Sequence, residues 1–333
     1  MRFVDLPAHG DADVMRLGTR PLPVPQAGEI LIRVAGAGIN APDLQQRRGR
    51  YDPPPGASPI LGLEVAGEVA ALGGGASRFR IGDRVAALCN GGGYADYVAV
   101  PEGQALPLPI GWSMRAAAAL PETFFTIQQT LVMRAGLSSG MTLLIHGAAG
   151  GIGGAAISIA KTYGATPIAV VSSPEKAAYA LGLGAIAAID RTQEDFVARI
   201  MAVTDGRGAD RIVDIVGGET FAKNLAASAT EGAILQLATL GGGAAEINAG
   251  LIVQKRLSIF GSTLRPQPPA VKAAIAASLA EAVWPALGDG RIRPPRTQYF
   301  PLESVVEAHS AMEQRSHFGK IVLLTGFGAA APD

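Results

Sequence analysis

The stretch MTLLIHGAAGGIGGAAISIAKTY, residues 141–163, decides the fold. It opens with an apolar strand, Met141–His146, and closes with a helix, Ala155–Tyr163, and only Gly, Ala and Ile residues separate the two. Small residues let backbone amides approach a pyrophosphate, and the N-terminus of the following helix presents the positive end of its dipole. The stretch predicts dinucleotide binding, with a merely structural turn as the alternative. The predicted contacts in it are Ala148, Gly150, Gly151 and Ile152.

Further strands, each alternating with a helix, continue this pattern along the chain. The predicted strands are 167–171, 185–189, 211–216, 233–238 and 257–261. Strands that are apolar along almost their whole length belong to parallel sheets with both faces covered. The fold class is therefore α/β, and this part of the chain is predicted to be a doubly wound six-stranded parallel sheet of the Rossmann type.

The remainder of the chain is organised differently. Short apolar segments such as Ile30–Ala35, Leu63–Leu72 and Arg84–Leu88 are separated by Gly-rich turns, which predicts a small barrel or sandwich. After an Ala-rich helix over 269–287, the tail returns to short strands and one helix. We therefore expect two domains, a β-rich one over 1–122 with 266–333 and a dinucleotide-binding one over 123–265.

Composition excludes several classes of protein. The 333 residues hold 28 basic and 28 acidic side chains, so there is no surplus of positive charge for nucleic acid or an anionic membrane. With 48% hydrophobic residues, disorder is excluded. Residues 135–160 carry no charge but include seven glycines, which favours a buried strand and helix over a membrane span. No secretory signal is visible, and the single cysteine fits a reducing compartment, so we expect the cytoplasm.

The end of the second strand of the dinucleotide-binding part indicates which cofactor binds. An NAD enzyme usually places Asp or Glu there for the ribose 2′-hydroxyl, whereas this chain has Ser172 and Ser173. Lys176 follows on the next helix and Arg191 follows the third strand. Hydroxyls and two cations suit a 2′-phosphate, so the prediction is NADPH. The alternative is that both cations are solvated surface charges.

A metal site is not expected. Catalytic zinc needs three protein ligands, and the chain offers one Cys and four His, no pair of which has ligand spacing. Cys89 is interpreted as a small packed residue because no His or cation lies close to it in the sequence.

Segments along nearly the whole chain resemble a known family. They are GINAPDL (38–44), QRRGRYDPPP (46–55), LGLE (61–64), GDRV (82–85), PETFFT (121–126), the Gly-rich turn, GSTLR (261–265) and GKIVL (319–323). The chain resembles the zinc-free quinone oxidoreductases of the medium-chain dehydrogenase/reductase superfamily, in the zeta-crystallin branch and close to the mammalian stress-inducible NADPH quinone reductases. Leu63 stands where zinc-dependent members have His, and Arg191 stands where the family often has Tyr.

This resemblance implies a GroES-like catalytic domain, a Rossmann domain and a cleft between them. It implies that Tyr51 donates a hydrogen bond to a quinone oxygen, that Asn40 orients substrate or nicotinamide, and that Asp43 takes part in the same site. The alternatives are a Tyr51 packed among the prolines at 53–55 and an Asn40 that is only a turn residue. For Asp43, a structural bond is favoured over a role as a base. Further implied or predicted cofactor contacts are Thr126, Val216, Ser262 and Lys320. The alternatives are a plain helix hydroxyl at Thr126 and a surface lysine at Lys320.

The expected activity is metal-free reduction of quinones by NADPH. Reduction of an activated alkene, such as an enone or 2-alkenal, is the second hypothesis. A nucleotide-bound structural or RNA-binding protein of the zeta-crystallin kind is the third, although the balanced charge counts against RNA. We also expect a homodimer, because the last Rossmann strand, Leu257–Gly261, would leave an apolar sheet edge to be covered.

Overall fold

The structure is a computed structural model that describes residues 1–315 and 317–331. The chain divides into two compact units. Unit 1 comprises Met1–Phe125 with Arg265–Asp333, and unit 2 comprises Thr126–Leu264.

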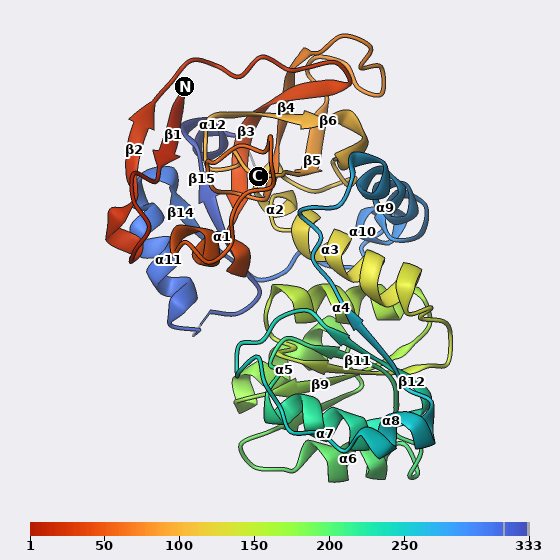
Figure 1. The fold of residues 1–333 in the computed structure, drawn as a ribbon. Helices are drawn as coiled ribbons and strands as arrows, with labels where there is room; N and C mark the ends of the chain where they lie inside the picture. Colours follow the sequence, from red (N-terminus) through yellow and green to blue (C-terminus); the bar gives the residue numbers. More distant parts are fainter. Residues whose placement is uncertain (316, 332–333) are drawn as a thin grey trace. The chain divides into compact units, whose positions relative to one another are not determined.

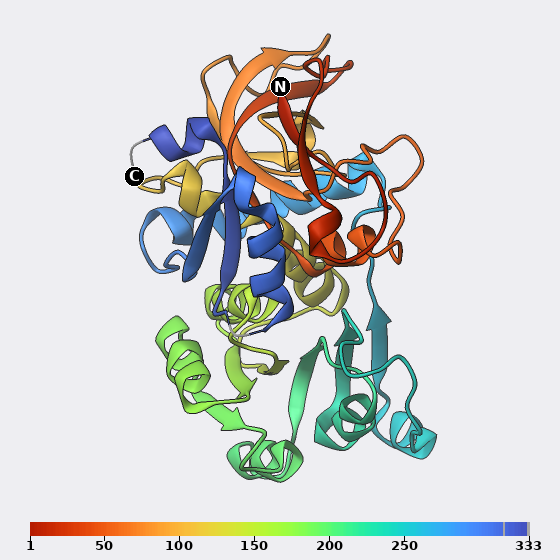
Figure 2. The same ribbon diagram turned by 90° about the vertical axis from the view of Figure 1, so that its left-hand side faces the viewer.

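Unit 1 is organised around the long strand β3 (Glu29–Gly38), which pairs on its two sides with β4 (Glu64–Leu72), β6 (Tyr97–Pro101) and β15 (Lys320–Leu324). The sheet has seven strands in the order β14-β15-β3-β4-β5-β7, with β6 added on β3. The other members are β5 (Arg84–Leu88), β7 (Ala105–Pro107) and β14 (Thr297–Pro301). Ile30, Ile32 and Val34 alternate along β3 and enter one hydrophobic core, as the two-residue period of a strand requires. Figure 2 shows the ribbon of this unit from a second side, with its early strands in red and orange.

Smaller elements surround this sheet. A separate two-stranded sheet joins β1 (Arg2–Asp5) to β2 (Arg16–Thr19). The helices of unit 1 are α1 (Ala41–Arg47), α2 (Met114–Ala117), α9 (Pro269–Ala282), α10 (Trp284–Gly288), α11 (Val305–Glu313) and α12 (Gly326–Ala330). Helix α3 (Pro121–Ile127) crosses the division between the units and continues as a π-helical stretch, Gln128–Arg134.

The Ala-rich helix predicted over 269–287 is wrong as a single element. It ends at Ala282, and α10 begins at Trp284 with Pro285 in its first turn. Proline has no N–H to continue the hydrogen bonding of a preceding helix but is tolerated at a helix start. The proline therefore separates two helices that composition alone joins.

Unit 2 is the predicted parallel sheet of six strands, in the order β10-β9-β8-β11-β12-β13 (Figure 1). The strands are β8 (Thr142–His146), β9 (Thr166–Val171), β10 (Ala187–Asp190), β11 (Ala209–Asp214), β12 (Ser228–Gln236) and β13 (Ser258–Gly261). Within this unit α4 (Gly151–Thr162) lies on one side of the sheet. On the other side lie α6 (Phe196–Val203), α7 (Glu219–Ala227) and α8 (Ala249–Lys255). The α/β class and the Rossmann sheet are confirmed.

The central strand β8 fixes where a ligand can bind in unit 2. Leu143, Leu144 and Ile145 are fully buried because both faces of the strand are covered. The chain runs from β8 to β9 on one side and later returns to β11 on the other. Ligands of open α/β sheets bind beyond the carboxyl ends of the strands, where the strand order reverses. That point is the end of β8 at His146.

Candidate cofactor and active site

The Gly-rich turn after β8 has the geometry of a pyrophosphate cradle. Gly147 has a φ of +67°, and a Cβ on Gly153 would come within 2.4 Å of the Cα of Ala148. Helix α4 begins at Gly151, and no side chain caps its N-terminus at Gly150. The first-turn amides of a helix have no partner within the helix, and their positive dipole end favours an anion. The predicted contacts Ala148, Gly150, Gly151 and Ile152 all lie in this turn and first helical turn.

The predicted 2′-phosphate residues lie together at the end of β9. The Ser173 hydroxyl caps α5 (Pro174–Leu183) by accepting from the Lys176 amide at 3.3 Å. The Lys176 ammonium donates to the Ser172 hydroxyl at 3.3 Å. The amide of Arg191 donates to the carbonyl of Val171 at 3.1 Å, so Arg191 stands beside the same strand end, with its side chain exposed.

A carboxylate, that of Glu175, also lies close to this group. Ser173 hydrogen-bonds the Glu175 side chain, and this bond, together with the Glu175 backbone amide, lowers the pKa of that carboxyl. Glu175 is one residue away from Lys176 in the first turn of α5, so the field at the strand end is less positive than two cations alone would make it.

A buried polar chain positions the loop after β11. His146 Nε2 lies 2.8 Å from Asn224 Oδ1, and Asn224 Nδ2 donates to Asp214 Oδ2 at 2.9 Å. Asp214 Oδ1 accepts from the amides of Val216, at 2.6 Å, and Gly217, at 3.1 Å. Burial lowers the pKa of His146, since the imidazolium would lose its hydration. The predicted contact Val216 is thus held by Asp214, which sequence reasoning missed.

Thr126 and Ser262, the other predicted cofactor contacts in unit 2, differ in their surroundings. The Thr126 hydroxyl is buried and has no hydrogen-bond partner in the part of the chain that the structure describes. An unsatisfied buried hydroxyl is costly, so a bound ligand that pairs with it would gain affinity. Ser262 donates from its hydroxyl to Gln129 Oε1 at 3.4 Å.

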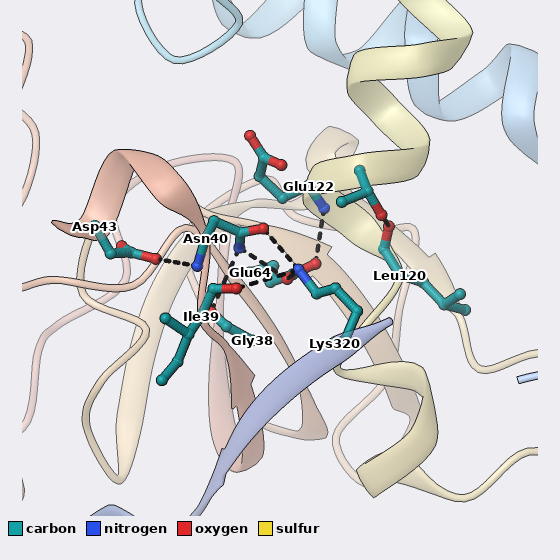
Figure 3. A network of polar contacts seen from close by, with 9 residues as sticks. Gly38, Ile39, Asn40, Asp43, Glu64, Leu120, Glu122 and Lys320 are labelled. Atoms are coloured by element: carbon teal, nitrogen blue, oxygen red, sulfur yellow. Dashed lines mark hydrogen bonds and ion pairs between the residues drawn. The ribbon is translucent and has the colours of Figure 1, made fainter. Parts of the chain in front are cut away.

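In unit 1, Asn40 belongs to a closed polar network (Figure 3). Its side-chain nitrogen donates to Glu64 Oε1 at 2.8 Å, and its oxygen accepts from the Lys320 ammonium at 2.6 Å. Lys320 also pairs with Glu64 Oε1 at 2.5 Å and donates to the carbonyl of Ile39 at 3.4 Å. The other Glu64 oxygen accepts from the Glu122 amide at 2.9 Å. All three ammonium protons of Lys320 therefore have acceptors within unit 1.

Asp43 is fully buried and fastens the start of α1. One carboxyl oxygen accepts from the Asn40 amide at 2.8 Å, in a capping box, and the other accepts from the Gly62 amide at 3.0 Å. The Tyr94 hydroxyl is a further hydrogen-bond partner. Burial raises the pKa of Asp43 to about 6, although these hydrogen bonds and Arg265 oppose the shift. Such a site favours a positioning role over proton abstraction.

Tyr51 follows α1 and is half-buried, and no hydrogen bond to its hydroxyl occurs among the described residues. The guanidinium carbon of Arg265 lies 5.6 Å from the centre of its ring. Burial raises the pKa of the Tyr51 phenol, and Arg265 opposes that rise. The hydroxyl is therefore a protonated donor at neutral pH. The contact between Arg265 and Tyr51 joins residues far apart in the chain, so no local sequence pattern predicts it.

The residues that could ligate a metal are scattered. In residues 1–315 and 317–331, no three His, Cys, Asp or Glu side chains form a group that could hold a metal ion. Leu63 is buried, 3% exposed, and burial raises the pKa of the Cys89 thiol, which keeps it protonated. Over the same residues, none of the helices has the length and apolar character needed to cross a membrane.

Comparison with known proteins agrees with a β-rich unit followed by a dinucleotide-binding unit. Residues 26–110 match the profile of the alcohol dehydrogenase GroES-like domain, and residues 151–280 match that of the zinc-binding dehydrogenases. A quinone oxidoreductase of Pseudomonas aeruginosa is 32% identical over 326 residues, which are 96% of this chain and 98% of that protein.

Two solved structures show the same likeness in three dimensions. Escherichia coli quinone oxidoreductase, complexed with NADPH, has a TM-score of 0.85 and 27% identity, over 97% of this chain and 100% of that one. An NAD-dependent alcohol dehydrogenase has a TM-score of 0.84 and 30% identity, over 98% of this chain and 100% of that one.

A GroES-like unit joined to a Rossmann sheet with a Gly-rich turn defines the medium-chain dehydrogenase/reductase superfamily. Within that superfamily, the chain belongs to the quinone oxidoreductase family.

Proposed function

We propose that this protein is an NADPH-dependent oxidoreductase that reduces quinones without a metal ion. The observation that carries the proposal is the full-length likeness to quinone oxidoreductases, one of them complexed with NADPH. The Gly-rich turn from Gly147 to Gly153 supports it. A Cβ on Gly153 would collide with the Cα of Ala148, so the turn needs glycine to keep its tight, pyrophosphate-binding shape.

The residues of unit 2 fit the cofactor, whose nicotinamide ring supplies a hydride when it is bound. The uncapped first turn of α4 would hold the pyrophosphate, and the orphaned Thr126 hydroxyl would gain a partner at the nicotinamide end. At the adenosine end, Lys176, Arg191 and the two serines would hold the 2′-phosphate. Val216 and Ser262 are also proposed to contact the cofactor, because they follow the carboxyl ends of β11 and β13.

The residues of unit 1 would then act on the acceptor. Quinones are strong electrophiles, so the protein needs only to orient the acceptor and to stabilise the charge that develops on its oxygen. Tyr51 is the proposed donor because its phenol is protonated and uncommitted. Asn40 and Asp43 would position the loop that carries it, since their own polar atoms are bonded internally. Lys320 would act through Glu64 and Asn40, and direct contact with the cofactor stays a prediction.

A substrate panel tests this proposal. Consumption of NADPH is followed with a benzoquinone, a phenanthrenequinone, an enone and a 2-alkenal. The proposal expects the quinones to have the highest kcat/KM. A higher value for the enone or the 2-alkenal would establish the alkene reductase hypothesis instead. If NADPH is consumed with none of the four acceptors, both the quinone and the alkene reductase hypotheses are refuted. A gel shift with RNA, competed by NADPH, would then test the hypothesis of an RNA-binding protein.

Two further properties belong to the proposal. A homodimer is supported by β13, which in the described part of the chain pairs with β12 alone and carries Ile259, 41% exposed, at the sheet edge. A cytoplasmic location is supported by the single, buried and protonated Cys89, which suits a reducing compartment.

A further inference from the structure

Two buried cations, Arg265 and Lys272, lie next to each other in unit 1, and Arg265 also contacts the ring of Tyr51. Arg265 is 5% exposed and Lys272 is fully buried. The guanidinium donates to the Asn90 carbonyl, at 3.0 and 2.8 Å, and to Gln46 Oε1 at 2.7 Å. The ammonium donates to Asn90 Oδ1 at 2.5 Å and to the Arg265 carbonyl at 2.7 Å. Every one of these acceptors is neutral.

Buried cations are usually paired with a carboxylate, because an isolated charge loses its hydration without compensation. In the described part of the chain, neither Arg265 nor Lys272 has a carboxylate within the 4.0 Å of an ion pair. Burial, and secondly Arg265, lower the pKa of Lys272 to about 8, and burial also lowers the pKa of Arg265. Asp43 acts on Arg265 only from beyond ion-pair distance, so this cluster carries positive charge that internal anions offset only in part.

The positive charge of Arg265 acts on the phenol of Tyr51. Its ring lies against the Arg265 guanidinium at 5.6 Å, within the range of a cation–π contact. The charged groups that influence the phenol are Arg265, which favours the phenolate, and Glu122 and Asp43, which oppose it. Arg265 is thus the one cation among them, and it comes from the point where the chain re-enters unit 1.

We propose that Arg265 is a positioning residue that makes Tyr51 a proton donor rather than only a hydrogen-bond donor. This inference rests on the proposed function. As the quinone gains a hydride with its electron pair, one oxygen becomes an anion. The Tyr51 O–H bond breaks and a new O–H bond forms on that oxygen. The electron pair stays on Tyr51, which becomes a phenolate with the guanidinium over its ring. Water returns the proton after the hydroquinone leaves.

A double-mutant cycle distinguishes this role from a structural one. We expect Arg265→Gln to lower kcat/KM for benzoquinone about 2- to 30-fold, the factor to which a cation–π contact corresponds. In a Tyr51→Phe background, Arg265→Gln should lower kcat/KM for benzoquinone little further, because the hydroxyl on which Arg265 acts is already absent. Arg265→Lys should recover part of the rate. Equal losses in both backgrounds would overturn the proposal.

Arg115→Gln is the matched control. Arg115 also lies over a tyrosine, with 5.0 Å between its guanidinium carbon and the centre of the Tyr299 ring, and it belongs to the same unit. Its removal should leave kcat/KM for benzoquinone unchanged.

A second measurement does not depend on activity. Tyrosine is replaced by fluorotyrosine, and fluorine NMR follows the titration of the Tyr51 signal, which is assigned by its loss in Tyr51→Phe. The midpoint should be higher in Arg265→Gln than in wild type and unchanged in Arg115→Gln. Should Arg265→Gln fail to fold, Asn90→Asp carries the test. It is nearly isosteric and places a carboxylate on Lys272, so it should also raise the midpoint.

Equal midpoints in wild type, Arg265→Gln and Asn90→Asp would refute the role of Arg265 even in an active enzyme. A wild-type protein that consumes NADPH with no acceptor of the panel would refute the proposed function instead. The two failures are therefore distinguishable.

Discussion

Tyr51 is the residue on which the proposed chemistry depends most. Tyr51→Phe removes the hydroxyl and keeps the ring against Arg265, so substrate stacking should survive. The loss of one transition-state hydrogen bond of about 1–3 kcal/mol should lower kcat/KM for quinones about 5- to 150-fold. Steady-state kinetics with one quinone decide the matter, and a rate equal to wild type would mean that another group serves the acceptor oxygen.

Lys176 and Arg191 test the preference for NADPH at the same scale. Both lie at a solvent-accessible strand end, so each contact with a 2′-phosphate should be worth about 1.5 kcal/mol, or about tenfold in affinity. Lys176→Ala and Arg191→Ala should each weaken NADPH by that factor and leave NADH nearly unchanged. Glu175→Gln is the converse variant, because it removes a nearby negative charge, and it should strengthen NADPH. Calorimetric titration with both cofactors measures this, and an equal loss for NADPH and NADH would contradict it.

Residue by residue, local order along the chain places the proposed site residues of unit 2 more directly than those of unit 1. The Gly-rich turn, Ser172, Ser173 and Lys176 follow their strands directly, so local order along the chain places them. Arg265 contacts Asn90 across 175 positions, and Lys320 contacts Glu64 across 256. Such pairings depend on how strands and helices pack, and no local pattern marks them. Arg265 and Glu64 both lie in segments that resemble the family, but a shared motif does not show which contacts its residues make.

Among the elements, the short helix α1 carries the clearest dependence on pH. The pKa of Asp43 is raised from 3.8 to about 6 on folding, so the folded state binds its proton more tightly than the unfolded state. The contribution of this group to the free energy of unfolding therefore falls as pH rises from about 4 to about 6, by up to about 3 kcal/mol. Asp43→Asn does not titrate, so the stability of wild type relative to this variant should decline over that window.

Denaturant unfolding at a series of pH values measures this difference. Comparison with the variant cancels other titrating groups, such as His309, whose pKa burial lowers to about 3. A wild-type advantage that stays constant from pH 4 to 7 would show that Asp43 does not change its proton affinity on folding.

The elements themselves were predicted unevenly. The six strands of unit 2 were predicted because a strand buried on both faces is apolar throughout, as Leu143, Leu144 and Ile145 show. The many alanines over 269–287 favour one continuous helix, whereas Pro285 marks the start of a second helix, α10. The π-helical stretch Gln128–Arg134 has no signal in residue type that separates it from an ordinary helix.

For the whole molecule, the predicted homodimer can be tested at the edge of the unit 2 sheet. Light scattering should give twice the chain mass of 34.0 kDa at micromolar concentration. Ile259→Lys places a charge on the outermost strand β13 and should shift the protein to the monomer, since charged residues block edge pairing. Ile186→Lys is the matched control, because Ile186 is 64% exposed just before β10, at the opposite edge. A wild-type mass near 34 kDa would contradict the dimer.

The central claim, that this protein reduces quinones with NADPH and without a metal, is tested most directly by one kinetic measurement. The purified protein is dialysed against a chelator, and oxidation of NADPH by a benzoquinone is followed at saturating cofactor. The rate should be unchanged by the chelator, and elemental analysis should find less than stoichiometric zinc. When the assay is repeated at one subsaturating cofactor concentration, NADPH should give a higher rate than NADH. A rate lost on chelation and restored by zinc, or no oxidation of NADPH by any quinone, would contradict the account.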